Sequence, residues 1–288
     1  MRLRLGWFAL LAAVAAPADP ARAAAQCRFE YALLARGSEV GRITLEQERL
    51  SPVRTRVVLR IENVGFTRLF GRRRVEMRGV VRTAADPVPV LYEGRERKPD
   101  RERLVTMRFD AHGRLTAFRY LNNGRERPSE VPEDLRRDAV DPLTAFLRLQ
   151  RWVQRGPAAG ARLKVPVWDG RKRLDIEAVY LAETRLDGRA LYARLRVRLQ
   201  GLHGFEDGYG FVGGTAAPAR WLEVLVDDGA CPAPVFVRPV DADDLAILRR
   251  RAVRRPRRRR FPSRAGAAAA RRSRTSPARC RNRPPVRP

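Results

Sequence analysis

The 288-residue chain contains few of the residues that build metal or nucleophilic sites. It has two histidines and three cysteines, and no CxxC or HxxxH spacing occurs. The sequence therefore offers no ligand set for a metal such as zinc. No Gly-x-Ser-x-Gly motif occurs either, which argues against the hydrolases that expose a serine on that turn. We expect no cofactor, no metal and no catalytic set, and hence no enzyme.

Long hydrophobic runs are also missing. The longest, residues 5–16, is shorter than the ~20 apolar residues that a helix needs to cross a bilayer. Two arginines precede this run, and the small residues Ala21, Ala23, Ala24 and Ala25 follow it. This order is typical of a secretory signal peptide. We interpret residues 1–25 as a cleaved signal peptide, with an uncleaved anchor as the alternative, and expect a periplasmic protein.

Acidic residues are scarce, with 32 against 60 basic residues and a net charge of +28. Residues 249–288 alone contain seventeen arginines and no acidic residue. Such a segment cannot bury a core, so we predict a disordered tail. It has two interpretations: a polycationic arm that attracts polyanions, nucleic acid included, without specificity, or the product of a shifted reading frame. Export argues against a specific nucleic-acid partner.

The three cysteines are Cys27, Cys231 and Cys280. Two of them can pair in an oxidising compartment. Cys27 precedes the first predicted strand and Cys231 precedes the last. Because first and last strands meet when a sheet curls toward closure, a disulfide between Cys27 and Cys231 is one hypothesis.

Between the two terminal segments, residues 26–248 alternate between apolar and charged side chains. The clearest cases are 53–61 and 191–199, which are typical of half-buried antiparallel strands with one solvated face. Further strands are expected at 29–35, 40–48, 73–83, 88–96, 103–109, 115–121, 163–168, 174–182, 221–226 and 235–240. Asn123-Gly124 and Asp169-Gly170 favour tight hairpins between strands. So many short strands rarely stay flat, so we predict a mainly β fold: a large antiparallel sheet, curled or closed into a barrel.

Two helices are expected within this sheet protein. Asp141 is a good N-cap, Pro142 suits the first helical position, and an apolar stripe continues to Val153 before Gly156 ends the helix. A second, short helix is expected over 241–250, with acids at its start and arginines at its end.

Two clusters resemble a phosphate-binding or a catalytic motif, but we interpret both as loops. Residues 208–213 fit the G-x-G-x-x-G pattern, yet no helix pattern follows to complete a phosphate site. His203 lies beside Glu206 and Asp207 without a nucleophile, so it is expected on the surface.

Arginines line the solvated faces of the two clearest strands. They are Arg54, Arg56, Arg60, Arg194, Arg196 and Arg198. A row of guanidinium groups can hold phosphate or carboxylate bidentately, which makes these residues candidates for anion binding. A merely solvated face is the alternative.

Several segments together resemble a bacterial family of exported proteins. They are FEYAL at 29–33, the Gly-turn strand at 37–45, DPLTAFL at 141–147, VWDGR at 167–171 and the segment 221–234. The pattern resembles the domain-of-unknown-function 3108 family (DUF3108) from residue 28 to about residue 240. The resemblance implies an envelope location, a β-rich fold and no established activity. The arginine-rich tail departs from what the family leads us to expect.

The sequence thus predicts a non-catalytic envelope protein. Its sheet would bind an apolar or anionic envelope ligand, such as a lipid or glycan, or support envelope assembly with a protein partner, and peripheral membrane contact is compatible with its charge. The alternative is an envelope hydrolase that acts through carboxylates the sequence does not single out. The oligomeric state is not predicted.

Overall fold

The computed structural model describes residues 26–186, 190–205, 212–214, 219–240 and 247–251. Several sequence predictions fall outside this part of the chain. They are the signal peptide, the first part of the expected second helix, most of the glycine-rich motif, Glu206 and Asp207, and the tail from residue 252 onward.

The fold is mainly β, which confirms the predicted class. Strands of the first half are β1 (Gln26–Ala35), β2 (Ser38–Ser51), β3 (Arg54–Asn63), β4 (Arg74–Thr83), β5 (Pro87–Lys98), β6 (Arg101–Phe109), β7 (Leu115–Asn122) and β8 (Arg125–Arg127). Those of the second half are β9 (Arg162–Trp168), β10 (Arg173–Leu186), β11 (Ala190–His203), β12 (Val212–Gly213), β13 (Leu222–Asp227), β14 (Pro234–Pro239) and β15 (Ile247–Arg251). The helical elements are η1 (Gly65–Phe70), α1 (Glu133–Arg136) and α2 (Pro142–Gln154).

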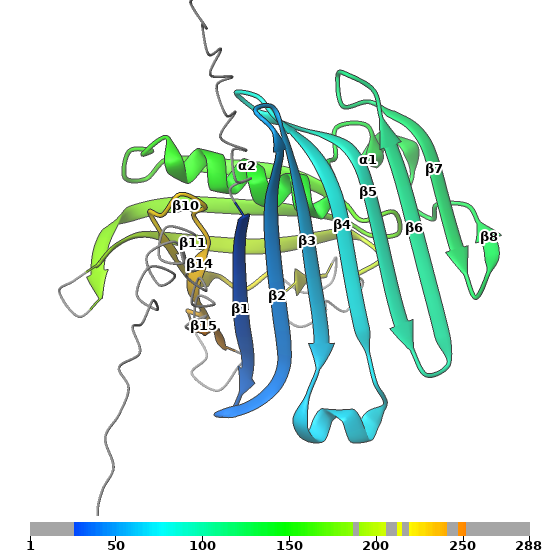
Figure 1. Cartoon of the computed structure of the whole chain (residues 1–288), viewed down its shortest axis with the longest axis horizontal. Coiled ribbons are helices and arrows are strands. Elements are labelled where there is room, and N and C mark those ends of the chain that lie inside the picture. Colours follow the sequence, from blue (N-terminus) through cyan, green and yellow to red (C-terminus); the bar gives the residue numbers. More distant parts are fainter. Residues whose placement is uncertain (1–25, 187–189, 206–211, 215–218, 241–246, 252–288) are drawn as a thin grey trace, which may run out of the picture. The chain divides into compact units, whose positions relative to one another are not determined.

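These strands form one hydrogen-bonded path (Figure 1). Its order is β8-β7-β6-β5-β4-β3-β2-β1-β15-β14-β13-β11-β10-β9, and β12 pairs with β11 off the path. All neighbours on the path are antiparallel. Within the described residues, the parallel pairings are β11–β12 and an isolated bridge between Val140 and Val167. The path begins at β8 and ends at β9, so this part of the chain forms a curled sheet rather than a closed barrel.

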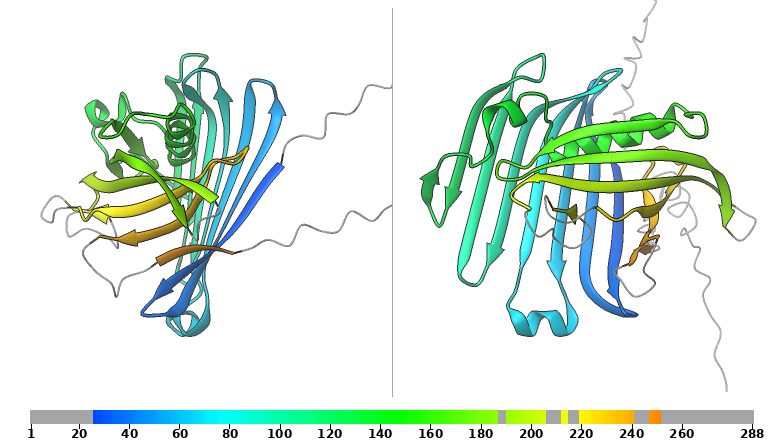
Figure 2. Two further views of the ribbon diagram at one scale, coloured as in Figure 1. Left: turned by 90° about the vertical axis from the view of Figure 1, so that its left-hand side faces the viewer. Right: turned by 180° about the vertical axis from the view of Figure 1, so that it is seen from behind.

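The curled sheet has two layers, which Figure 2 shows from the side and from behind. Strands β1–β7 make one layer, and β9, β10, β11 and β13 cross its inner face. Apolar side chains at alternate positions of the first layer, such as Val57, Val81 and Val105, are buried on this inner face. The period-two pattern of the sequence therefore places the apolar side chains of a strand on the inner face, where they are buried.

Helix α2 packs against both layers, and the predicted cap is confirmed. The Asp141 carboxylate accepts hydrogen bonds from the backbone N–H groups of Leu143 (2.9 Å) and Thr144 (3.0 Å), which satisfies orphan donors of the first turn. Leu143 and Leu147 belong to the core of the first layer. Trp152, further along the helix, packs on the core of the second layer. The helix thus occupies the space between the layers.

The expected second helix was wrong for residues 247–250, which belong to strand β15. This strand pairs with β1, where Leu248 lies opposite Leu33, and with β14, where Leu248 lies opposite Val237. Two neighbouring edges would otherwise leave their backbone N–H and C=O groups unpaired, so long-range pairing overrides the local charge pattern. The sheet also extends three residues into the segment that the sequence assigned to the tail.

The hairpin predictions had different outcomes. Asn123 and Gly124 have φ values of 50° and 75° and join β7 to β8 by a two-residue turn, as expected for Asn-Gly. Asp169 and Gly170 instead belong to a four-residue connection between β9 and β10. The Asp169 carboxylate accepts backbone hydrogen bonds from residues 171 and 172, and this Asx arrangement favours the wider turn.

A disulfide bond joins Cys27 in β1 to Cys231 in the β13–β14 connection. The two Cα atoms are 6.4 Å apart, and 204 residues separate the cysteines along the chain. This is the pairing that the sequence hypothesis named. It links the two layers covalently beside the β1–β15–β14 junction.

Candidate functional site

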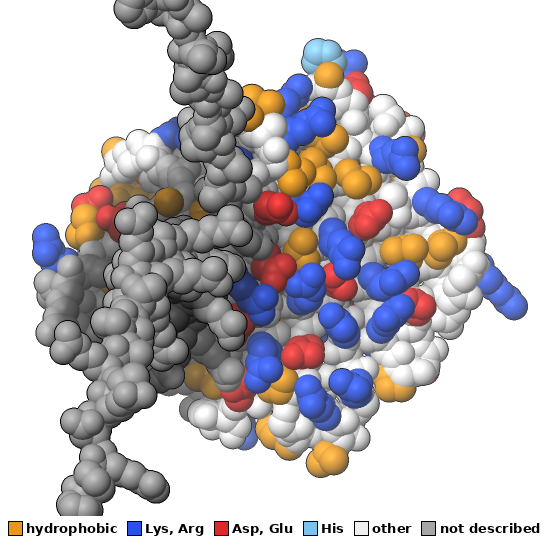
Figure 3. All heavy atoms as spheres, viewed as in Figure 1, with side chains coloured by type: hydrophobic (Ala, Val, Ile, Leu, Met, Phe, Trp, Pro, Cys, Tyr) orange, Lys and Arg blue, Asp and Glu red, His pale blue; other side chains and the backbone are white. Residues whose placement is uncertain are grey.

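The arginine rows found in the sequence lie on solvated strand faces and mostly form ion pairs. Arg56 pairs with Glu48 at 3.0 Å, and Arg60 pairs with Glu46 at 3.0 Å. Figure 3 shows Lys and Arg side chains interspersed with acidic ones over the face that β1–β7 present to the viewer. The positive charge of this face is therefore largely neutralised by its neighbours.

The second row behaves similarly. Arg194 pairs with Glu223 at 2.6 Å, and Arg198 pairs with Glu177 at 2.6 Å. Arg54 and Arg196 form no ion pair in the described part of the chain. Cross-strand pairing favours the solvated-face interpretation over a shared anion site, and anion binding by these six residues stays a prediction.

A different charge cluster lies on the inner face of the sheet, toward the end of β3 and β4 at which η1 joins them. Its centre is Glu96 of β5, whose residue is 9% exposed. Four cationic side chains surround its carboxylate. The distances are 2.9 Å to Arg73, 3.4 Å to Arg103, 3.5 Å to Arg171 and 3.7 Å to Lys98. One buried acid thus holds several cations around a single point.

This cluster borders a cavity of about 230 Å³, which we call the inner cavity. Its apolar lining comes from strands β3 to β6 and from a residue just after the end of β11: Ile61, Val75, Met77, Tyr92, Val105 and Phe205. Its charged lining consists of Arg73, Arg95, Arg103, Arg171 and Lys172 against Glu96 and Asp169. Five cationic and two acidic side chains therefore line the cavity next to an apolar floor, and one of the cations, Arg95, also pairs with Glu102 at 3.3 Å.

The β9–β10 connection completes the inner cavity. The Asp169 carboxylate accepts hydrogen bonds from the backbone N–H groups of Arg171 (2.9 Å) and Lys172 (2.7 Å). Gly170 has φ of 95°, and a Cβ there would lie 2.4 Å from a methyl group of Val105. Glycine is thus required both by the backbone and by the close approach to β6. This turn places Arg171 against Glu96.

Burial and neighbouring charges shift the pKa values of this cluster in physically consistent directions. Burial opposes ionisation of Glu96, but Arg73, Arg171, Lys98 and Arg103 together hold the pKa of its carboxyl below its usual value. Burial, reinforced by the nearby Arg171, lowers the pKa of Lys172. The carboxylate is therefore ionised near neutral pH, where such a group is a weak proton acceptor.

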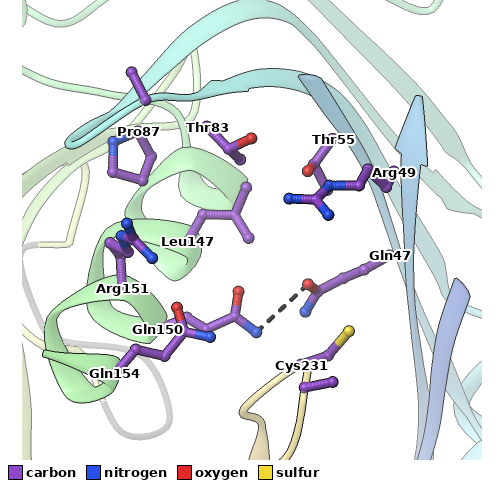
Figure 4. Close-up of a pocket in the computed structure, with 12 residues that line it drawn as sticks. Gln47, Arg49, Thr55, Thr83, Pro87, Leu147, Gln150, Arg151, Gln154 and Cys231 are labelled. Carbon is purple, nitrogen blue, oxygen red and sulfur yellow. Dashed lines mark hydrogen bonds between the residues drawn. The ribbon is translucent and has the colours of Figure 1, made fainter. Parts of the chain in front are cut away.

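A second cavity, of about 350 Å³, lies beside the disulfide at the other end of β3 (Figure 4). Gln47 of β2 points into it and is 5% exposed. Its carbonyl oxygen accepts a hydrogen bond from the amide of Gln150 in α2 at 3.4 Å. Arg49 and Arg151 also line this cavity. Its polar lining contrasts with the apolar floor of the inner cavity.

Both linings combine cationic and apolar side chains. Among the described residues, neither lining contains a histidine or a serine, and the cysteine of the second cavity belongs to the disulfide. No group of three or more metal-ligating side chains occurs in the part of the chain that the structure describes. In that same part, no helix has the length and apolar character to span a bilayer.

Sequence reasoning missed the inner cavity because its charged residues come from four separate segments. One signal was available in β5. Tyr92, Gly94 and Glu96 occupy alternate, inward-facing positions, so an acid interrupts an apolar face. A charge at such a position requires partners, but the alternation pattern alone does not identify them.

Among solved structures, the chain is similar to a beta-barrel-like protein of the domain of unknown function DUF1849 from Brucella abortus. The two share 9% sequence identity with a TM-score of 0.44, over 79% of this chain and 98% of that chain. No curated protein matches the chain. The family described as "Protein of unknown function (DUF3108)" matches residues 28–203, so the chain belongs to the DUF3108 family.

Proposed function

We propose that this protein binds an anionic amphiphile in the inner cavity, as a non-catalytic protein of the bacterial envelope. The observation that carries the proposal is the excess of cations over an apolar floor around Glu96. In the bound state, a phosphate or carboxylate group contacts Arg103 and Arg171. The first methylene groups of the ligand lie on Met77 and Phe205.

Charge balance supports an anionic ligand. Glu96 is the shared counter-ion of four cations at 2.9–3.7 Å, so its single negative charge does not by itself balance them. The buried Nε of Arg103 has no hydrogen-bond partner among the described residues. An unsatisfied buried donor is costly, and a ligand oxygen would remove that cost. Guanidinium groups suit phosphate and carboxylate in particular, because their donors match both oxygens of the anion.

The lining supports an amphiphile rather than a free inorganic anion. Met77, Val75 and Phe205 present apolar surface next to the charges, and burial of methylene groups against them contributes about 0.8 kcal/mol each. A volume of about 230 Å³ is below the range of cavities that enclose whole drug-sized ligands. We therefore expect the polar group and the nearest part of the chain to enter, with the remainder outside.

Binding fits the cluster better than ester hydrolysis, the alternative from the sequence. Cations keep the pKa of Glu96 low, whereas a general acid or base works best with a pKa near the working pH. Envelope location is supported by the signal-like composition of residues 1–25. It is also supported by the Cys27–Cys231 disulfide, because such bonds persist in oxidising compartments.

The proposal is tested by titrating the purified protein with octyl phosphate, using octanol and inorganic phosphate as single-feature controls. Isothermal titration calorimetry should detect binding of octyl phosphate and a weaker affinity for each of the two controls. Arg103→Gln should weaken octyl phosphate binding by about tenfold, because one charge-assisted contact is lost. Arg198→Gln, which removes an ion-paired arginine outside the inner cavity, should not.

Two results would contradict the proposal. One is the absence of octyl phosphate binding to the folded protein. The other is equal affinity of the parent and Arg103→Gln, which would place any binding elsewhere.

A further inference from the structure

The turn between β3 and β4 exposes apolar side chains to water. It consists of the 3-10 helix η1, in which Leu69 is 85% exposed and Phe66 is 55% exposed. In Figure 1, η1 forms the lower tip of the β1–β7 layer, and Figure 3 shows hydrophobic side chains at that end of the same face. Two large apolar side chains so exposed on one short turn are costly in water.

The turn is held by polar contacts rather than by an apolar core. The Asn63 amide donates hydrogen bonds to the carbonyl oxygens of Thr67 and Gly71, each at 2.9 Å. Its oxygen accepts a hydrogen bond from the backbone N–H of Arg73 at 2.8 Å. Gly71 has φ of 97°, where a side chain would be strained. These contacts fix a conformation in which Phe66 and Leu69 are exposed.

Cationic side chains gather at the same end of β3 and β4 as η1. A surface hollow at this end has six cationic lining residues and one acid: Arg68, Arg72, Arg73, Arg74, Arg97 and Lys98 against Glu62. Within the described residues, Arg68, Arg72 and Arg74 form no ion pair. This differs from the outer strand faces, where most arginines face an acid. The tip therefore combines exposed apolar groups with uncompensated positive charge.

We propose that this tip, η1 with its surrounding arginines, docks on the surface of an anionic lipid bilayer. Phe66 and Leu69 enter the interfacial region, and Arg68, Arg72 and Arg74 contact lipid phosphates. Apolar insertion together with cationic attraction is the combination that holds proteins on anionic membranes. A projecting tip with two apolar side chains offers too little area for a stable protein interface, whereas a bilayer accepts such a tip without a matching surface.

The docking surface is adjacent to the inner cavity, because Arg73 lines both the surface hollow and the cavity. The inference goes beyond the ligand proposed for the inner cavity and does not depend on it. Phe66 and Leu69 belong to the tip and do not line the inner cavity. Their substitution therefore tests membrane docking without altering the proposed ligand site.

The test measures binding of the full chain to vesicles of phosphatidylglycerol and phosphatidylcholine, with vesicles of phosphatidylcholine alone for comparison. The double variant Phe66→Ser, Leu69→Ser should weaken co-sedimentation with anionic vesicles on the order of tenfold. Val53→Ser is the matched control, because Val53 is 53% exposed but lies in the β2–β3 turn, at the opposite end of β3. It should bind like the parent.

A local readout separates the tip from the arginine-rich segment after residue 251, whose charge is also expected to attract anionic vesicles. The variant Leu69→Trp should show a blue-shifted emission with anionic vesicles and quenching by lipids with brominated acyl chains. Val53→Trp should show neither effect. Unchanged Leu69→Trp emission, or equal vesicle binding by the parent and the double serine variant, would overturn the proposal.

Discussion

Substitution of Glu96 by glutamine should change stability and ligand affinity in opposite directions. The shape of the side chain is kept, but its negative charge is removed from the centre of four cations at 2.9–3.7 Å. The folded protein then contains cations that repel one another with no shared counter-ion. Glu96→Gln should therefore lower the free energy of unfolding.

The magnitude follows from burial. Removing one partner of a buried ion pair costs about 3–5 kcal/mol. The lower end, about 3 kcal/mol, applies here because the Arg73 side chain is 39% exposed and partly screened by solvent. For a domain of this size, this corresponds to a decrease in Tm of roughly 6–12 °C.

The stability that Glu96→Gln loses should depend on pH, and the direction of that dependence follows from the pKa of Glu96. The pKa of Glu96 is lower in the folded protein than its usual value, so the ionised carboxylate stabilises the fold above the unfolded pKa of about 4.3. That contribution disappears as the pH falls through the lower, folded pKa. The difference in unfolding free energy between the parent and Glu96→Gln should thus be full at neutral pH and shrink in acid.

Ligand affinity should increase in this variant. The Glu96 carboxylate competes with a bound phosphate for Arg103 and Arg171, so its neutralisation should strengthen octyl phosphate binding by about tenfold, since like-charge repulsion in a partly dry site is worth at least that much. Octyl phosphate should also recover part of the lost Tm, because a ligand that binds only the folded state stabilises it.

Differential scanning calorimetry and calorimetric titration measure the two effects on the same samples. Glu223→Gln is the matched control. Glu223 is also 9% exposed, and it lies between Arg194 and Arg238 at 2.6 and 2.7 Å, outside the inner cavity. It should lose stability without any change in ligand affinity. Weaker octyl phosphate binding by Glu96→Gln would refute the reasoning, since the carboxylate would then be a ligand contact and not a competitor.

Two further substitutions test the architecture around the cavities. Cys231→Ser should lower the free energy of unfolding by about 2–5 kcal/mol, because the disulfide closes a loop of 204 residues. Urea denaturation measures this, and the reasoning fails if a reductant leaves the parent's midpoint unchanged. Gly170→Ala should cost about 2 kcal/mol and weaken octyl phosphate binding, because the new Cβ meets Val105 and displaces the turn that carries Arg171. Gly124→Ala has a similar φ of 75° but no atom within 4 Å, so it should affect stability alone, and equal ligand binding by both alanine variants would contradict this role of the turn.

Local sequence patterns were sufficient to predict most strands of the sheet. Strand β3 was expected at 53–61 and spans Arg54–Asn63, and the helix after Asp141 ends before Gly156 as expected. These elements follow from side-chain alternation and from capping, which act over a few residues. Strand β15 did not follow, because its partners β1 and β14 are distant in the sequence and its local charges favour a helix end.

In the candidate site too, local patterns identified residues but not their partners. The sequence drew attention to arginines on strand faces, and the structure pairs most of them with acids of neighbouring strands. The unbalanced arginines are instead those around Glu96 and around η1, where a turn or a curled layer brings separate segments together. Cross-strand register decides which charges meet, and a single strand does not contain that information.

By itself, the sequence determined the family, the mainly β class, the cap and extent of α2, and the pairing considered for Cys27 and Cys231. Each depends on short patterns of polarity, or on the few cysteines available. Only the tertiary structure decided that the sheet curls without closing in the described residues, that α2 lies between its layers, and that Glu96 gathers four cations. These features depend on which distant strands become neighbours, and that choice follows from burying all the apolar faces at once.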